Sequence, residues 1–500
     1  MNKEIMKELS KVKEHYNKVE ELTKLIVLAE WDLRISMPKK GLDSRANTIS
    51  FISGELFKLA TSNEVASFIA YFEPLMDELS LQDRAMIRKM KREYDQISKI
   101  PEDRYKEFSR LSILSGQAWE EAKEKSDFSI FKPHLEKIVD MKREFAEYYG
   151  YEDNKYDALL NEYEEGLTVK KLDSVFCELK EAIINLLDYI NSNDDKVDYS
   201  FLQEKYDIEK QKELSDYLLD LIQFDKEKGR LDETEHPFTT NMGNKDVRIT
   251  THYYERDLFS NIFSVIHEGG HALYEMHISD DLIGTGLAEV PSMSLHESQS
   301  RFYENIVGRS KEFLGVILPT LKEKFPQLED IDVDKLYKAV NKVEPSLIRT
   351  EADELTYSLH IIIRYEIEKQ LINGDISVSE LPEVWNKKYK EYLGVEPKND
   401  AEGVLQDMHW SDGSFGYFPS YALGNLYGCQ MLNTMLKDNS TALTDLKSGD
   451  LTYINNWLSD NVHKYGSLYD SEELLERVTG EELNPKYFID YLNKKYKDIY

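Results

Sequence analysis

The chain has 500 residues and a formal net charge of -31 at pH 7. Hydrophobic residues make up 41% of it and aromatic residues 11%, which is enough for a large buried core and excludes wholesale disorder. Because a strongly negative surface repels phosphate backbones and anionic lipid head groups, nucleic-acid and membrane partners are disfavoured.

The cysteine content and the amino terminus indicate the cellular compartment. The two cysteines, Cys177 and Cys429, are too few for a disulfide framework. The first residues, MNKEIMKELSKVKEHY, are charged and lack the apolar core of a signal peptide. No run approaches the roughly 18 apolar residues of a membrane span. We therefore expect a cytoplasmic protein.

Helical periodicity dominates the chain. Apolar residues recur at three- and four-residue steps from Leu9 to Ile26, with Lys and Glu between them. The same pattern predicts helices in four further stretches, 202–224, 336–343, 357–371 and 487–496. One segment, Val247 to Tyr253, alternates apolar and polar residues and is rich in β-branched and aromatic types, which predicts a strand. Because no Pro-rich or Gly/Ser-rich linker divides the chain, residues 1–500 are expected to form one mainly α-helical unit.

The most informative motif is HEGGH at residues 267–271. On a helix, His267 and His271 lie about 40° apart around the axis, so both imidazoles can reach one ion. Glu268 is rotated by about 100° from His267, which suits a base acting on a water bound to that ion. Gly269 and Gly270 each cost a helix about 1 kcal/mol relative to Ala, which indicates close packing at this point. The motif predicts a zinc-dependent peptidase.

The third metal ligand is less certain from spacing than the first two. Hydrolytic zinc usually has three protein ligands and one open position, and two His with one Glu is a known peptidase set. Glu297 is the best candidate, since it would lie early on a second helix beginning after Pro291. However, Ser294-x-x-Glu297 also fits a capping box, in which Glu297 would bond the helix amino terminus. Five other residues compete for the third position: Glu275, Glu289, Glu304, His277 and His296.

Six ordered sequence blocks resemble the carboxypeptidase Taq family of metallocarboxypeptidases. They are His236-Pro237-Phe238, DVRIT at 246–250, HEGGH, HESQ at 296–299, IRTEAD at 348–353 and GVLQDMHW at 403–410. The likeness runs from Trp31-Asp32 to the FGYFPSY segment ending at Tyr421. Leu33-Arg34 departs from the family pattern, which has more polar residues there, but lies away from the metal motif.

The resemblance implies a fold and an activity. The fold would be largely helical, with two lobes around a deep central groove and a small β element, similar to neurolysin and angiotensin-converting enzyme. The activity would be release of carboxy-terminal amino acids from peptides, with broad specificity. The cofactor would be Zn²⁺, with Co²⁺ able to replace it, and the assembly a homodimer.

The resemblance also implies roles for individual residues. Glu297 would complete the metal site with His267 and His271, and Glu268 would be the catalytic base. Tyr421 and His409 would stabilise the tetrahedral intermediate. For the terminal carboxylate of the substrate, Arg349 is the first choice and Arg248 the second, and His236 would line the groove. The DVRIT segment would offer an edge strand for the substrate backbone.

Two other functions fit the same sequence. An oligopeptidase of the neurolysin type would use the same metal chemistry to cut internal bonds of short peptides. A catalytically silent helical binding protein with a vestigial site belongs to a different class. Product analysis on amidated peptides separates the first from a carboxypeptidase, and a zinc measurement coupled to a turnover assay identifies the second.

Overall fold

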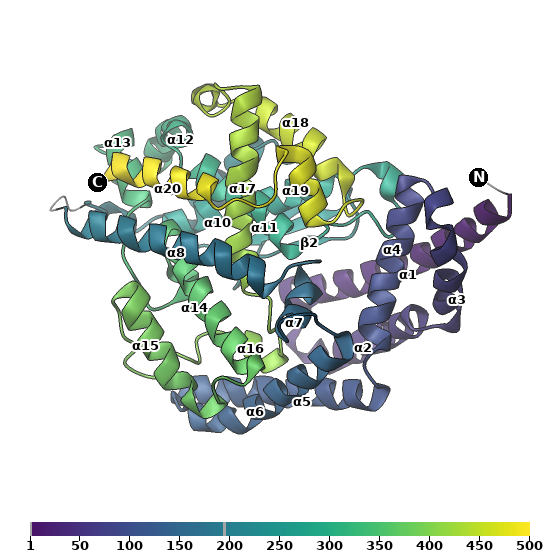
Figure 1. Ribbon diagram of the computed structural model, residues 1–500. Coiled ribbons are helices and arrows are strands. Elements are labelled where there is room, and N and C mark those ends of the chain that lie inside the picture. Colours follow the sequence, from purple (N-terminus) through teal and green to yellow (C-terminus); the bar gives the residue numbers. More distant parts are fainter. Residues whose placement is uncertain (1–2, 194–196) are drawn as a thin grey trace.

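The computed structural model describes residues 3–193 and 197–500, and most of these residues are helical (Figure 1). The amino-terminal part contains α1 (Lys3–Ile35), α2 (Leu42–Ala60), α3 (Asn63–Phe72), α4 (Leu81–Ser98), α5 (Glu102–Lys125), α6 (Phe128–Tyr149), α7 (Asp157–Tyr163), α8 (Val169–Asn191) and α9 (Ile208–Leu221). A small sheet follows, with β1 (Gly229–Glu233), β2 (Thr239–Asn241) and β3 (Val247–Thr251).

The part that follows the sheet is again helical. Its helices are α10 (Leu258–His277), α11 (Met293–Arg301), the π-helical turn η5 (Phe302–Gly308), α12 (Lys311–Lys324), α13 (Val333–Val340), α14 (Glu354–Asn373), α15 (Leu381–Leu393), α16 (His409–Asp412), α17 (Pro419–Asp438), α18 (Thr452–Asn461), α19 (Ser471–Thr479) and α20 (Lys486–Ile499). In Figure 1, α17 stands above the centre and packs against α11, with α1 to α4 on the right and α5 and α6 along the lower edge.

The mainly helical class is confirmed, and each predicted helical stretch contains a helix, although α13 ends at Val340 and not at Val343. In the stretch 202–224, however, α9 begins only at Ile208, because the Asp207 side chain caps it by accepting a hydrogen bond from the backbone N–H of Lys210. Within the described residues, every helix is too short or too polar to cross a membrane.

The sheet confirms the predicted strand but corrects its place. β3 lies in the middle, parallel to β1 and antiparallel to β2. The expectation that DVRIT forms an edge strand is therefore wrong: both edges of β3 are already paired, and its Val247 and Ile249 side chains are fully buried. The neighbours β1 and β2 escaped prediction because they are short and mostly polar.

Helix α11 is held closely by helices on two sides. A side chain at Gly270 of α10 would place its Cβ 2.8 Å from the carbonyl oxygen of Gln299 in α11. A side chain at Gly424 of α17 would lie 2.8 Å from Cγ of Glu297. The close packing predicted at Gly269 and Gly270 is confirmed, since a Cβ at Gly269 would meet Ile222. Absent side chains therefore set how near α10, α11 and α17 approach.

Replacement of Gly270 tests this close contact. Gly270→Ala should destabilise the protein by about 1–3 kcal/mol, because the new methyl meets backbone atoms of α11 that cannot move alone. Gly116→Ala is the matched control, since nothing lies within 4 Å of its Cβ in helix α5. That variant should gain about 0.5–1 kcal/mol from helix propensity. Thermal unfolding at one scan rate measures both, and equal shifts would contradict the steric explanation.

Candidate metal centre

Three side chains from α10 and α11 converge. The rings of His267 and His271 lie one helical turn apart, with centroids separated by 5.0 Å. Nε2 of His267 is 3.8 Å and Nε2 of His271 is 3.5 Å from Oε2 of Glu297. One ligand atom from each residue lies within 4.8 Å of the others, so the group could hold a metal ion. Two imidazoles and one carboxylate form a donor set that suits a divalent transition metal.

Outer partners orient two of these three side chains, His267 and Glu297. Oε2 of Glu304 lies 2.8 Å from Nδ1 of His267; because a carboxylate can only accept, Nδ1 is the donor, and in the neutral imidazole this leaves the lone pair on Nε2, the atom nearer Glu297. Nε of Arg301 donates to Oε1 of Glu297 at 2.7 Å. Burial opposes the charge on Glu297, but Arg301 and the two imidazoles hold the pKa of its carboxyl well below the usual range.

The amino-terminal cap of α11 is a different residue from the one that the capping box requires. Ser292 is the cap, and its side chain accepts a hydrogen bond from the backbone N–H of Leu295 at 3.1 Å. Ser294 already lies within the helix, so the capping-box alternative for Glu297 is wrong. Apart from Glu304, the competing residues have other partners: Glu275 lies against His296, Glu289 against Lys89, and His277 against His463.

Glu268 follows His267 on α10 and contacts the sheet. Oγ1 of Thr239, the first residue of β2, donates a hydrogen bond to Oε2 of Glu268 at 2.6 Å. Two residues further along β2, Asn241 donates to Glu275, which lies two turns further along α10. Glu268 is buried, with 7% of its surface exposed. The strand is thus fastened to α10 at two points, and Thr239 orients the Glu268 carboxylate.

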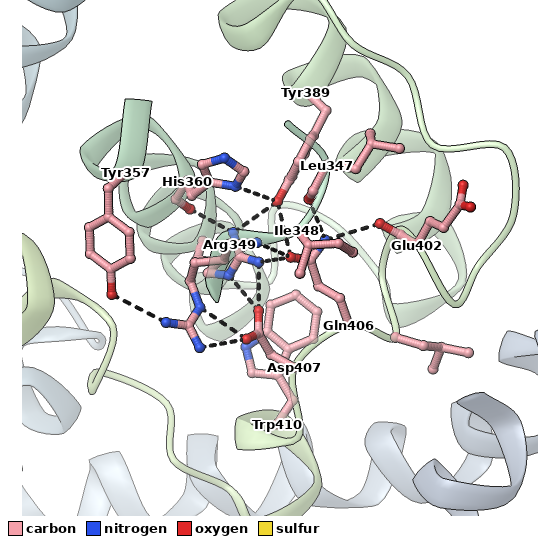
Figure 2. A network of polar contacts seen from close by, with 12 residues as sticks. Leu347, Ile348, Arg349, Tyr357, His360, Tyr389, Glu402, Gln406, Asp407 and Trp410 are labelled. Carbon is pink, nitrogen blue, oxygen red and sulfur yellow. Dashed lines mark hydrogen bonds and ion pairs between the residues drawn. The ribbon is translucent and has the colours of Figure 1, made fainter. Parts of the chain in front are cut away.

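Arg349 belongs to a buried network of charges shown in Figure 2. Its Nε and Nη2 donate to Oδ1 of Asp407 at 3.0 and 2.9 Å, and Nε of Arg364 donates to Oδ2 at 2.7 Å. Oε1 of Gln406 accepts from the backbone N–H of Arg349 and from Nη2 of Arg364. Burial opposes ionisation of Asp407, yet the two guanidinium groups hold its pKa well below the usual range. Two cations therefore share one carboxylate.

A chain of contacts connects Arg349 to the candidate ligands. Nη1 of Arg349 donates to the hydroxyl of Tyr357 at 3.2 Å. The guanidinium carbon of Arg301 lies 4.6 Å from the centre of the Tyr357 ring. Because Arg301 also bonds to Glu297, two side chains span the space between Arg349 and the converging ligand atoms.

Tyr421 and His409 lie beside Arg349. The guanidinium carbon of Arg349 is 5.1 Å from the ring centre of Tyr421, and the ring centres of His409 and Tyr421 are 6.3 Å apart. Burial lowers the pKa of His409 to about 4, so its imidazole is neutral at pH 7. Burial also raises the pKa of the Tyr421 phenol above its ordinary value. Each group can therefore donate a hydrogen bond at neutral pH.

The remaining predicted residues have surroundings of their own. Arg248 donates from Nε and Nη2 to the carboxylate of Asp246, at 2.8 Å each, and its guanidinium carbon lies 4.5 Å from the ring centre of Trp31. His236 is exposed in the segment between β1 and β2. Within the described part of the chain, no hydrogen bond or ion pair joins either residue to the three candidate ligands.

Sequence reasoning missed several residues that shape the site. Arg301 stood four positions after Glu297 and three before Glu304, a spacing that puts all three on one helix face and could have been noticed. Asp407 lay inside the quoted GVLQDMHW block. Thr239 and Arg364 carried no local signal, because their partners Glu268 and Asp407 are distant in the sequence.

A cavity of about 1040 Å³ lies away from these groups, between α4 and the α7–α8 region. Arg88, Arg92 and Asn161 are among its lining residues, whereas the candidate ligands, Arg349 and Tyr421 are not. The side chains that could bind a metal ion converge between α10 and α11, outside this cavity, so cavity volume alone does not locate the candidate site.

Two histidines and a glutamate that could hold a metal ion, with a second buried glutamate beside them, are an arrangement typical of metallopeptidases. The family model described as carboxypeptidase Taq (M32) metallopeptidase matches residues 11–496. The chain belongs to this family and is a metallocarboxypeptidase.

Similar proteins cover nearly the whole chain. Carboxypeptidase 1 of Bacillus subtilis is 46% identical over 484 residues, which are 97% of each chain. Thermostable carboxypeptidase 1 of Thermus thermophilus is 39% identical over 494 residues, or 96% of each chain. Among solved structures, a Pyrococcus furiosus carboxypeptidase superposes with a TM-score of 0.96 at 36% identity, covering 99% of both chains. The family resemblance seen in the sequence is confirmed.

Proposed function

We propose that His267, His271 and Glu297 hold Zn²⁺, with Co²⁺ able to replace it, and that the protein uses this site to release carboxy-terminal residues from peptides. The observation that carries the proposal is the convergence of two Nε2 atoms on one carboxylate oxygen. The fit is supported by the Glu304 carboxylate on Nδ1 of His267, since metal-binding histidines usually have such a partner.

A bound Zn²⁺ would polarise the scissile carbonyl and lower the pKa of a bound water to about 7. Glu268 would take the proton from the attacking water and deliver it to the leaving amine. The hydrogen bond from Thr239 supports this role, because it leaves the other oxygen of Glu268 available for the proton. Burial of Glu268 also keeps competing bulk water away from the carboxylate.

Tyr421 and His409 would donate hydrogen bonds to the developing oxyanion. Support comes from their protonation: burial keeps the phenol protonated and the imidazole neutral at pH 7. The ring of Tyr417 lies 5.5 Å from that of His409 and 5.1 Å from that of Tyr421, which limits the movement of both donors.

Arg349 would bind the terminal carboxylate of the substrate. Arg349 and Arg364 share the single carboxylate of Asp407, so this group carries an excess positive charge in buried surroundings and favours an added anion. Arg248 is a weaker candidate because its pair with Asp246 matches one positive charge with one negative charge and leaves no excess positive charge for an added anion. His236, exposed between β1 and β2, would contact substrate at the groove.

We further propose that residues 1–500 act as one catalytic unit with two lobes around the groove, that the enzyme is a cytoplasmic homodimer, and that its specificity is broad. Support for a single unit comes from the distribution of the site, whose residues extend from Thr239 in β2 to Tyr421 in α17. Names of the similar proteins favour a carboxypeptidase over an internal-bond oligopeptidase.

Removal of the metal tests the cofactor. Dialysis against a strong chelator should abolish hydrolysis, and stoichiometric Zn²⁺ or Co²⁺ should restore it, because the proposed mechanism needs a Lewis acid. A chelator already saturated with metal serves as the control for non-specific inhibition. Hydrolysis that continues at full rate in protein shown to be metal-free would contradict the proposal.

Replacement of Glu268 tests the catalytic base. Glu268→Gln should retain one metal per chain but lower kcat by about 10²–10⁴-fold, the usual worth of a positioned general base. Glu275→Gln is the matched control, since this carboxylate lies two turns along the same helix and contacts Asn241. If both variants lose activity equally at full metal content, Glu268 has no special role.

Amidated substrates test Arg349. Blocking the peptide carboxylate should slow the wild type, whereas Arg349→Ala should hydrolyse free and amidated peptides at similar reduced rates, since the group that distinguishes them is gone. Metal content and thermal unfolding check that the variant folds. Arg248→Ala is the comparison and should still discriminate between the two peptides. Discrimination retained by Arg349→Ala and lost by Arg248→Ala would reverse the assignment.

A further inference from the structure

Arg301 lies where it can control two of the three candidate ligands at once. It is the last residue of α11, one turn beyond Glu297, and its side chain is 18% exposed. Its Nε donates to Oε1 of Glu297 at 2.7 Å, and its Nη1 donates to Oε2 of Glu304 at 3.3 Å. The same oxygen of Glu304 accepts from Nδ1 of His267. One guanidinium group therefore restrains a carboxylate and, through Glu304, an imidazole.

The two oxygens of Glu297 have different surroundings. Oε1 accepts the charge-assisted hydrogen bond of Arg301 at 2.7 Å, whereas Oε2 accepts a longer one, at 3.2 Å, from the neutral hydroxyl of Ser300 and lies 3.8 and 3.5 Å from the Nε2 atoms of His267 and His271. A carboxylate that lacks a charged hydrogen-bond donor such as this guanidinium group can bind an ion with both oxygens. We propose that Arg301 is a positioning residue that limits Glu297 to one coordinating oxygen, an inference that rests on the proposed metal site.

The guanidinium group is itself held in place. Its carbon lies 4.6 Å from the ring centre of Tyr357, so the group is packed against an aromatic face while its nitrogens point at the two carboxylates. Glu304 is also held by Arg309, whose Nη2 donates a hydrogen bond to Oε1 of Glu304 at 3.1 Å. Arg301 thus has fixed partners, and the restraint on Oε1 of Glu297 is built into the fold.

Single-oxygen coordination matters because it leaves positions on the ion open for water and the substrate carbonyl. If Oε1 were released, Glu297 would occupy one more coordination position on the ion, and the substrate carbonyl would compete with Oε1 for that position. Loss of Arg301 should therefore lower kcat at saturating metal by about 10–100-fold, which is the usual effect of losing an outer partner of a metal ligand.

The experiment compares Arg301→Met, Arg301→Lys and Arg309→Met, each loaded with Zn²⁺ or Co²⁺. X-ray absorption of the zinc form and the visible spectrum of the cobalt form report the coordination number independently of activity. Arg301→Met should raise the coordination number by one, weaken the Co²⁺ absorption and lower kcat more than it changes KM. Arg301→Lys should recover part of the wild-type spectrum, because an ammonium can still donate to Oε1.

Arg309→Met is the matched control, since Arg309 binds Glu304 but not Glu297. It should leave the coordination number unchanged. An Arg301→Met protein with the wild-type coordination number, or an Arg309→Met protein with the same spectral change, would overturn the role of Arg301. Failure of the wild type to bind metal would instead contradict the proposed function.

Discussion

Everything at the candidate metal centre depends on the close approach of α11 to α10 and α17. Ligands from two different helices meet only if the helix axes are held at a fixed spacing, and here that spacing is set by the absence of side chains. Gly270 faces the backbone of α11 and Gly424 faces Glu297 itself. Because packed interiors transmit displacements rather than absorb them, a small outward shift of α11 would carry Glu297 away from both imidazoles.

Buried charges are tolerated in this site because each has a defined partner. Glu297, Arg301 and Glu304 follow one another at four- and three-residue steps, so charges of alternating sign occupy one face of α11 and its π-helical continuation. The desolvation cost of each ion is offset by its pairing with the next, through hydrogen bonds of 2.7 and 3.3 Å. The chain's overall negative charge has little influence here, since local pairs outweigh a field that salt screens within about 10 Å.

Local patterns were sufficient to predict several helices, one strand and the placement of His267 and His271 on one helix face, because a helix fixes the relation of residues three or four positions apart. They could not choose between ligand and cap for Glu297, which depended on the backbone geometry of Ser292. They also misplaced DVRIT at a sheet edge, since strand order follows from β1 and β2, whose polar sequences carry little strand signal. The partners of Glu268 and Arg349 were out of reach because Thr239 and Asp407 approach them only through the tertiary fold.

The contacts that join the candidate metal ligand Glu297 to Arg349 would affect which peptide bond the enzyme cuts. Glu297 bonds to Arg301, Arg301 lies on the ring of Tyr357, and Tyr357 accepts from Arg349. Asp407 holds the far side of Arg349, so the Arg349 end of this chain of contacts is fixed. If Arg349 binds the terminal carboxylate, the distance from that anchor to the reacting carbonyl is set by the protein. A substrate whose carboxylate lies several residues beyond the scissile bond then fails to satisfy both sites together, and cleavage is confined to the last peptide bond.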